Sequence, residues 1–199
     1  MAQPLILASG SQTRAALLRN AVVPFSVQMP RIDEEMLRAA LDADGTRPRD
    51  IADRLAEAKA ARVAGKNPQA RVLGCDQVLE LDGEVLSKPT DQSDAAAQLR
   101  RLSARRHDLH SAVVLFDHGV PVWRHVGRVR MTMRALSNGY IDRYVERNWD
   151  SIRHCVGCYR LEGEGARLFS RIEGDFFTVL GLPLLPLLDQ LALMGVIET

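Results

Sequence analysis

The chain has 199 residues, of which 46% are hydrophobic and 26% charged, and its formal net charge is only +1. This composition excludes a disordered or fibrous protein, and a chain of this length buries roughly 70% of its unfolded surface on folding. The near-neutral charge provides no global field for nucleic acid, so any anion site must be a local cluster. Three cysteines are too few for a disulfide-rich secreted scaffold and favour a reducing cytoplasm.

Neither end of the chain predicts export or insertion into a membrane. The first residues lack the basic region and the long apolar core of a signal peptide. The most apolar stretch, residues 179–197, is interrupted by glycine, proline and aspartate, whereas a membrane-spanning helix needs about 20 predominantly apolar residues. We therefore expect a cytoplasmic protein without a membrane partner, and a buried final helix within residues 179–197 that follows a turn at Gly181-Leu182-Pro183.

The remaining pattern alternates strands with helices and contains no internal repeat. In chain order it predicts strand 5–8, helix 12–20, strand 25–29, helix 47–64, strands 72–81 and 84–86, helix 93–102, strands 109–116 and 126–133, and helix 137–146. A hairpin at Asp82-Gly83 joins two of these strands. Hairpins mixed with helices favour an α/β fold, in which helices flank a mixed sheet and two lobes surround a cleft, over a purely parallel sheet.

A candidate phosphate site follows the first strand. Ser9, Gly10 and Ser11 lead into a helix, which places unpaired backbone N–H groups and two hydroxyls at its N-terminus, where phosphate binds well. Arg14, one turn further, could clamp the same anion. An ordinary serine cap with a solvated arginine explains the segment equally well, and the glycine spacing and the Gly-Lys-Ser/Thr end of a Walker loop are missing.

Lys59 lies within the apolar face of the predicted helix 47–64, one turn from both Leu55 and Val63. An inward lysine is costly unless its ammonium finds an anion. The alternative is that the stem packs on apolar surface while the ammonium reaches water. The helix pattern therefore leaves open whether Lys59 binds a ligand.

Asp76 is the sharpest local feature, because it and Gln77 interrupt the apolar strand over residues 72–79. A buried carboxylate needs hydrogen bonds, a cation or a raised pKa, and these are also the conditions for a general base or a metal ligand. A structural aspartate bonded to a loop is the alternative. Glu34 and its acidic neighbours, which follow the second strand, could add oxygen ligands for Mg²⁺ or Mn²⁺ or could begin a solvated helix.

Two further features lie in the second half of the chain. Lys88, followed by Pro89 at the end of the hairpin, offers another cation on a rigid turn. Residues 157–165 read Gly-Cys-Tyr-Arg-Leu-Glu-Gly-Glu-Gly, which puts polar side chains such as Glu162 beside glycines that let a ligand approach the backbone.

Together these segments resemble the Maf family of nucleoside triphosphate pyrophosphatases. The resemblance covers about residues 5–195, and several separated motifs follow the family order. It is carried by Ser9, Ser11, Arg14, Glu34, Lys59, Asp76, Lys88-Pro89, and the Glu162 region running into Gly181-Leu182-Pro183. The resemblance implies two lobes around a deep cleft, a divalent metal cofactor, hydrolysis of a nucleotide to its monophosphate and pyrophosphate, and a homodimer in the cytoplasm. The near-neutral charge argues separately against a nucleic-acid partner.

The resemblance also implies roles for these residues. Asp76 would be chiefly the proton acceptor and would share the metal with Glu34, which is chiefly a ligand. The cationic and hydroxyl side chains would bind the phosphates and stabilise charge on the leaving oxygens; these are Ser9, Ser11, Arg14, Lys59 and Lys88.

Three positions, Thr13, Gln77 and Glu162, bear on the choice of base. In the branch of the family that is specific for dTTP and UTP, they are arginine, threonine and glutamine. Gln77 and Glu162 are instead similar to the branch that hydrolyses 7-methyl-GTP. A carboxylate accepts hydrogen bonds from the guanine N1–H and amino group, and it favours the positive ring of an N7-methylated base.

Two positions depart from the family pattern. Thr13 stands where the 7-methyl-GTP branch typically has a tryptophan that could stack on the base. Ala104 replaces a glycine in the Leu-Ser-Gly-Arg pattern, a mild change unless the backbone there needs a positive φ. Hydrolysis of dTTP or UTP, and a non-catalytic nucleotide-binding regulator of septum formation, are the alternative functions.

Overall fold

The computed structural model describes residues 3–198, which form two compact units. Unit 1 comprises the described residues up to Gln77, then Ser111–Gly127, and the described residues from Asp175 onward. Unit 2 comprises Val78–His110 and Arg128–Gly174. Each unit is therefore built from segments that are distant in the sequence.

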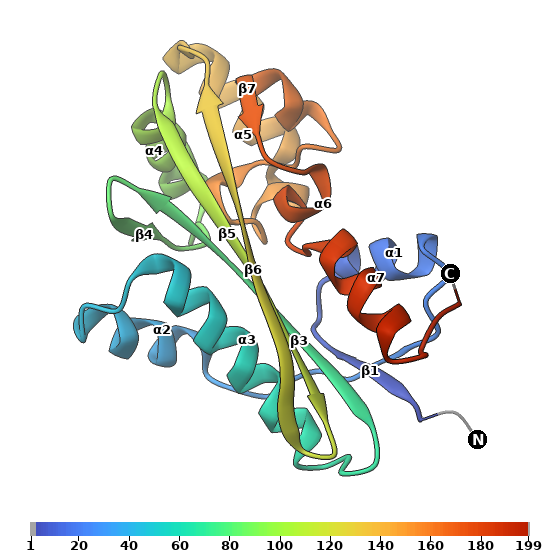
Figure 1. The fold of residues 1–199 in the computed structure, drawn as a ribbon. Coiled ribbons are helices and arrows are strands. Elements are labelled where there is room, and N and C mark those ends of the chain that lie inside the picture. Colours follow the sequence, from blue (N-terminus) through green and yellow to red (C-terminus); the bar gives the residue numbers. More distant parts are fainter. Residues whose placement is uncertain (1–2, 199) are drawn as a thin grey trace. The chain divides into compact units, whose positions relative to one another are not determined.

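Helices and strands alternate along the chain (Figure 1). In order they are β1 (Leu5–Ala8), α1 (Gln12–Asn20), β2 (Ser26–Val27), α2 (Glu34–Ala43), α3 (Pro48–Ala64), β3 (Arg71–Leu81), β4 (Glu84–Leu86), α4 (Gln92–Leu102), β5 (Arg106–Asp117), β6 (Val120–Met133), α5 (Asn138–Ile152), the 3-10 helices η1 (Val156–Cys158) and η2 (Glu164–Leu168), β7 (Phe169–Glu173), α6 (Phe176–Val179) and α7 (Leu184–Leu193).

The strands of the described residues form a seven-stranded mixed sheet. Its order is β2-β1-β3-β5-β6-β7, with β4 paired to β3. Strand β1 is parallel to β2 and β3, whereas the β3–β4 and β6–β7 pairs are antiparallel. The predicted α/β class with a mixed sheet is confirmed, and the predicted cleft between two lobes stays a prediction.

The core of unit 1 joins β1 to α1 and α7, which lie side by side in Figure 1. All four residues of β1 are buried, as expected for a short strand with a neighbour on each side. The main apolar cluster contains Leu5, Leu7, Leu17, Leu18, Val113, Leu115, Leu184, Leu187 and Leu191. This packing fixes the loop between β1 and α1.

Helix α3 packs closely against β3 because the residues that face each other are small. Ala56 and Ala60 are fully buried, and a Cβ added to Gly74 would lie 2.1 Å from the carbonyl oxygen of Ala56. A side chain at position 74 would therefore push the helix from the strand. The close approach brings Lys59 of α3 beside Asp76 of β3.

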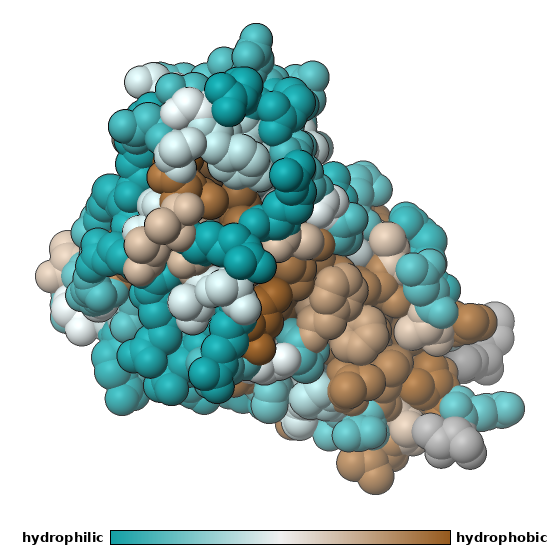
Figure 2. Space-filling view, turned by 90° about the horizontal axis from the view of Figure 1, so that it is seen from above, coloured by the Kyte–Doolittle hydropathy of each residue, from teal (hydrophilic) through white to brown (hydrophobic). Residues whose placement is uncertain are grey.

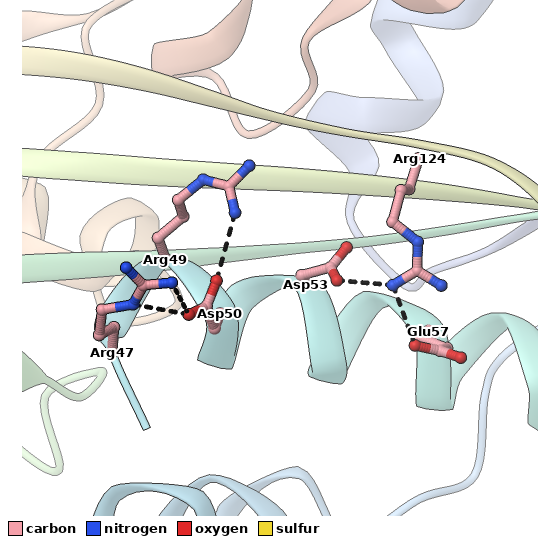
Figure 3. Close-up of polar contacts among 6 residues, drawn as sticks. All are labelled: Arg47, Arg49, Asp50, Asp53, Glu57 and Arg124. Atoms are coloured by element: carbon pink, nitrogen blue, oxygen red, sulfur yellow. Dashed lines mark hydrogen bonds and ion pairs between the residues drawn. The ribbon is translucent and has the colours of Figure 1, made fainter. Parts of the chain in front are cut away.

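Ion pairs also form along α3, both within its first turn and with strand β6 (Figure 3). Arg124 on β6 donates to Asp53 at 2.7 Å and to Glu57 at 3.2 Å, so one guanidinium joins two turns of the helix to the sheet. Arg47 and Arg49 lower the pKa of Asp50 in the first helical turn. Asp50 also complements the positive end of the helix, which has no side-chain cap at Arg47.

Unit 2 has its own core around α4 and α5. Leu99, Leu102 and Ile141 are almost fully buried between these helices and the strands. Tyr159 packs edge-on against Phe169 with ring centroids 4.7 Å apart, and its hydroxyl lies 2.8 Å from the Nε2 atom of His107. Aromatic contacts thereby tie the segment after α5 to β5 and β7.

The structure corrects several predicted boundaries. Strand β2 has two residues where 25–29 was predicted, strands β5 and β6 and helix α5 are longer than predicted, and α2 and β7 were not predicted. Helix α2 begins at Glu34 with Asp33 as its cap, so the acidic run does begin a helix. Strand β7 (Phe169–Glu173) reads Phe-Ser-Arg-Ile-Glu with only its first residue buried, so it lacks the alternation of apolar and polar residues that predicts a strand.

The predicted turn at Gly181-Leu182-Pro183 into the last helix is confirmed, but that helix is shorter than the apolar stretch 179–197. Gly181 adopts φ +90° and Pro183 follows, so the chain turns between α6 and α7, and α7 ends at Leu193. Nor is α7 buried all round, since Leu185 is 53% and Leu193 83% exposed. Figure 2 shows apolar surface on the side of unit 1 that carries this helix. Across the described residues, none of the helices has both the length and the apolar content to cross a bilayer.

Candidate active site

The loop between β1 and α1, in unit 1, is held by several side-chain hydrogen bonds. Ser11 caps α1, with its Oγ accepting from the backbone N–H of Arg14 at 3.3 Å. Ser9 is 3% exposed, and its Oγ accepts from the backbone N–H of Ser11 and from Nη1 of Arg14. The serine cap is therefore present, and Arg14 is held by the protein instead of being solvated.

Arg14 links three parts of unit 1. Its Nε donates to the carbonyl oxygen of Gly181 at 2.7 Å, and its Nη1 donates to the carbonyl oxygen of Cys75 at 3.1 Å. A Cβ on Gly181 would lie 3.2 Å from the guanidinium, so glycine suits both the positive φ and the close approach. These bonds use Nε and Nη1, which leaves Nη2 as the donor for an anion.

Lys59 brings two carboxylates together. Its Nζ lies 2.6 Å from Oδ1 of Asp76 and 2.7 Å from Oε2 of Glu34. The side chains of Lys59 and Asp76 are 6% and 10% exposed, whereas that of Glu34 is 45% exposed. The inward ammonium of Lys59 is therefore paired with two carboxylates, and α2, α3 and β3 each supply one member of the cluster.

This cluster fits a divalent cation whose coordination is completed by a substrate. Within residues 3–198, no group of three or more His, Cys, Asp or Glu side chains could hold a metal on its own. Mg²⁺ is, however, usually held by one or two carboxylates, with substrate phosphates and waters as its other ligands. Asp76 and Glu34 supply those two carboxylates, and their oxygens already converge on one cationic group.

Gln77, the neighbour of Asp76, has a bonding role that the sequence did not reveal. Its Nε2 donates to Oγ of Ser111 and to the carbonyl oxygens of Thr178 and Val179, at 2.9 to 3.2 Å. Ser111 and Thr178 are themselves almost fully buried. Because the amide nitrogen is engaged with the end of α6, only the amide oxygen of Gln77 is available to a nucleotide.

Lys88 and Glu162 both belong to unit 2, and both affect the pKa of the Cys155 thiol. Burial raises the pKa of the Cys155 thiol, while Lys88 lowers this pKa and Glu162 raises it. Lys88 is exposed, and Glu162 accepts two hydrogen bonds from Arg160 at 2.9 and 2.7 Å. The proposed phosphate ligand and the proposed base ligand of unit 2 therefore share one neighbourhood.

The comparison with known proteins identifies the family. Residues 4–194 match the model of the family described as Maf-like protein. The chain belongs to the Maf family. A nucleoside triphosphate pyrophosphatase of Ruegeria pomeroyi is 60% identical over 199 residues, the full length of both chains.

Two other Maf relatives have names that specify a substrate. The 7-methyl-GTP pyrophosphatase of Brucella abortus is 49% identical over 191 residues, 96% of each chain. That of Rhizobium meliloti is 50% identical over 194 residues, 98% of each chain. The predicted membership of the Maf family is thus confirmed, whereas the roles of the individual site residues stay predictions.

In this Maf chain, the structure brings the predicted residues together in two groups within unit 1. One group contains Ser9, Ser11 and Arg14, with Thr13 half-buried on the same turn of α1. The other contains Glu34, Lys59 and Asp76. Sequence reasoning missed Ser111 and Thr178, because isolated hydroxyl residues in otherwise apolar segments carry no pattern of their own.

Proposed function

We propose that the chain hydrolyses 7-methyl-GTP to 7-methyl-GMP and pyrophosphate. The coarser activity, that of a nucleoside triphosphate pyrophosphatase, is the one for which its full-length relatives are named. The observation that carries the proposal is the convergence of Asp76 and Glu34 on the buried ammonium of Lys59. Such a buried charged cluster beside a helix N-terminus suits the chemistry of a triphosphate.

The triphosphate would bind the cationic and hydroxyl groups that surround this cluster. Arg14 is already oriented by Ser9 and by the carbonyl groups of Cys75 and Gly181, so little side-chain entropy is lost when its free donor meets a phosphate. Lys59 carries a positive charge in a nearly water-free position, where its effect on developing negative charge is large. Lys88, an exposed residue of unit 2, would be a further phosphate ligand on the basis of the family resemblance alone.

Asp76 would act as the general base. Lys59 engages its Oδ1, which leaves Oδ2 to accept a proton from the attacking water. The water oxygen then forms a bond to a phosphorus of the triphosphate while the bond to the pyrophosphate leaving group breaks. Lys59 keeps the carboxylate oriented before the proton moves.

The cofactor in this proposal is Mg²⁺ or Mn²⁺. Glu34 and Asp76 would hold it, and when bound it would neutralise charge on the phosphates and on the leaving pyrophosphate. Glu34 is the more exposed of the two carboxylates and has no part in the proton transfer, so we assign it chiefly to the metal.

Base selection would depend on Glu162 and Gln77. Glu162 supplies a carboxylate oxygen for the donor groups of guanine, and Gln77 supplies its amide oxygen. Thr13 replaces the tryptophan of the 7-methyl-GTP branch, so base stacking at this position is not part of the proposal. A homodimer in the cytoplasm, implied by the family resemblance, belongs to the same proposal and is tested by light scattering of the purified protein.

The test is an endpoint assay with Mg²⁺ or Mn²⁺ on 7-methyl-GTP, GTP, dTTP, UTP, CTP and ATP, with products resolved by chromatography. We expect 7-methyl-GMP and pyrophosphate, with little product from dTTP or UTP. A Glu162→Gln, Gln77→Thr double variant should shift the preference towards pyrimidines. A wild-type preference for dTTP or UTP would overturn the base assignment, and binding without turnover of any nucleotide would favour a regulator.

A further inference from the structure

A cavity of about 180 Å³ lies within unit 2, between α5 and the glycine-rich segment that contains Glu162. Its wall includes Tyr144 and Asn148 from α5, and Arg160, Glu162 and Glu164 from the segment. Asn148 and Glu164 were not among the residues that the sequence singled out. The cavity is thus a concave site with several fixed polar groups, as ligand sites commonly are.

The amide of Asn148 has a fixed orientation. Its Nδ2 donates to the carbonyl oxygen of Tyr144 at 2.9 Å and to Oε2 of Glu164 at 2.8 Å. Arg147 binds the same carboxylate at 2.6 Å, and Arg147 and Asn148 hold the pKa of Glu164 below its usual value. An ionised carboxylate only accepts, so it must face Nδ2, and Oδ1 of Asn148 remains as an acceptor.

Glu162 has a matching acceptor. Arg160 donates to only one of its oxygens, Oε1, through both Nε and Nη2. Its other oxygen, Oε2, is therefore left for a ligand. The lining of the cavity thus includes two side chains that each keep one acceptor, Oε2 of Glu162 and Oδ1 of Asn148, and neighbouring groups hold both side chains in place.

The glycines keep the segment compact and open. A Cβ on Gly165 would lie 2.4 Å from the carbonyl oxygen of Arg160, so this turn requires glycine. At Gly163 the nearest atom to an added Cβ is that same oxygen at 3.9 Å, which leaves room for a ligand beside the backbone.

We propose that this cavity binds the guanine base and that Asn148 is a further specificity-determining residue, accepting a hydrogen bond from the exocyclic 2-amino group. Guanine presents two donors, its N1–H and its 2-amino group, and the lining supplies an acceptor for each, whereas adenine, uracil and thymine lack the 2-amino group. The inference rests on the proposed function, since it names how that substrate's base is read.

The test compares 7-methyl-GTP with 7-methyl-ITP, which differs only in lacking the 2-amino group. We expect the wild-type kcat/KM to be at least about tenfold higher for 7-methyl-GTP, because the absence of the amino group leaves Asn148 without a donor. In Asn148→Ala this ratio should approach one, with most of the loss on 7-methyl-GTP. Asn138→Ala, a matched change at the exposed start of the same helix, should retain the wild-type ratio.

The outcomes separate this inference from the proposed function. A wild-type enzyme that hydrolyses both nucleotides equally well overturns the inference and leaves the pyrophosphatase intact, and this result needs no variant. A ratio that persists in Asn148→Ala, or in the near-isosteric Asn148→Leu if the alanine variant does not fold, also overturns the inference. A wild-type enzyme that hydrolyses only pyrimidine nucleotides overturns the proposed function, and the inference with it.

Discussion

The two carboxylates assigned to opposite ends of the substrate occupy contrasting environments. Asp76 lies on β3 with its side chain 10% exposed, and its partner Lys59 comes from a different element. Glu162 lies on a turn with its side chain 28% exposed, and its partner Arg160 is two residues earlier on the same turn. The first pair is fixed by the fold, whereas the second is fixed mainly by its own loop. In the proposed function the chemistry would rest on the first pair and base selection on the second.

The largest expected effect comes from removing the buried carboxylate. Asp76→Asn preserves the size of the side chain but removes the proton acceptor, so turnover should fall by about 10²–10⁴-fold. Nucleotide binding, measured by calorimetry, should persist because Arg14 and Lys59 remain. Glu162→Gln is the control, since it should change the choice of base with a much smaller loss of turnover on the best substrate. Near-normal turnover in a folded Asp76→Asn protein would remove Asp76 from the role.

A matched pair of substitutions tests the difference in burial directly. Lys59→Met leaves Asp76 without its buried partner and should lower the free energy of unfolding by about 3–5 kcal/mol. Arg160→Met breaks the exposed pair and should cost about 0–1 kcal/mol. Urea unfolding of both variants provides the comparison. Equal losses would mean that the two pairs are equivalent and that the contrast in environment has no energetic consequence.

Unit 2 also contains a buried titratable group, but it is kept neutral. Burial lowers the pKa of His107 to about 4, from an unfolded value of about 6.5, and its ring is 2% exposed. As the pH falls below 6.5, His107 takes up a proton in the unfolded chain but stays neutral in the folded protein until the pH approaches 4. Stability is therefore complete above pH 6.5 and is lost as the pH falls towards 4.

The size of this loss follows from the shift. Between pH 6.5 and pH 5 the contribution of His107 should fall by about 2 kcal/mol, at 1.36 kcal/mol for each pH unit. Urea unfolding at the two pH values measures it. His107→Gln should flatten the dependence, whereas His154→Gln, at an exposed position, should leave it unchanged. An unaltered slope in His107→Gln would assign the pH dependence to other groups.

The sequence made Lys59 and Asp76 more conspicuous than Glu162, for physical reasons. Asp76 interrupts a continuous apolar strand and Lys59 interrupts an apolar helix face, so the hydrophobic pattern alone makes each of them conspicuous. Glu162 follows no periodic pattern, and its assignment depended on the family resemblance. Asn148 was missed because a polar residue on an amphipathic helix is ordinary, and only its tertiary partners distinguish it.

The fold shows the same division. Strong local signals, such as the Asp82-Gly83 hairpin and the capped helix after Ser11, were confirmed. The starts of β5 and β6 were missed because they carry polar residues, and distant partners accommodate these: Asp108 of β5 pairs with Arg128, and Arg124 of β6 pairs with Asp53. The Gly181 turn was itself predicted, but not its bond from Arg14, which is 167 residues away in the sequence. Local patterns cannot report such partners.

The smallest expected effect concerns the backbone of unit 2 at Ala104. This residue follows Ser103, the cap at the end of α4, and adopts φ +59°. The left-handed conformation after a helix usually belongs to glycine, because a Cβ there costs roughly 1–2 kcal/mol. Ala104→Gly should therefore stabilise the protein by about 0.5–1 kcal/mol, since the greater freedom of glycine in the unfolded chain offsets part of the gain. Thermal unfolding should shift upward by about 2–4 °C per kcal/mol.

Ala135→Gly is the control: this exposed residue has no positive φ, so the change should give no gain. Equal responses of the two variants would mean that Ala104 is not strained and that the departure from the family's glycine costs the fold nothing.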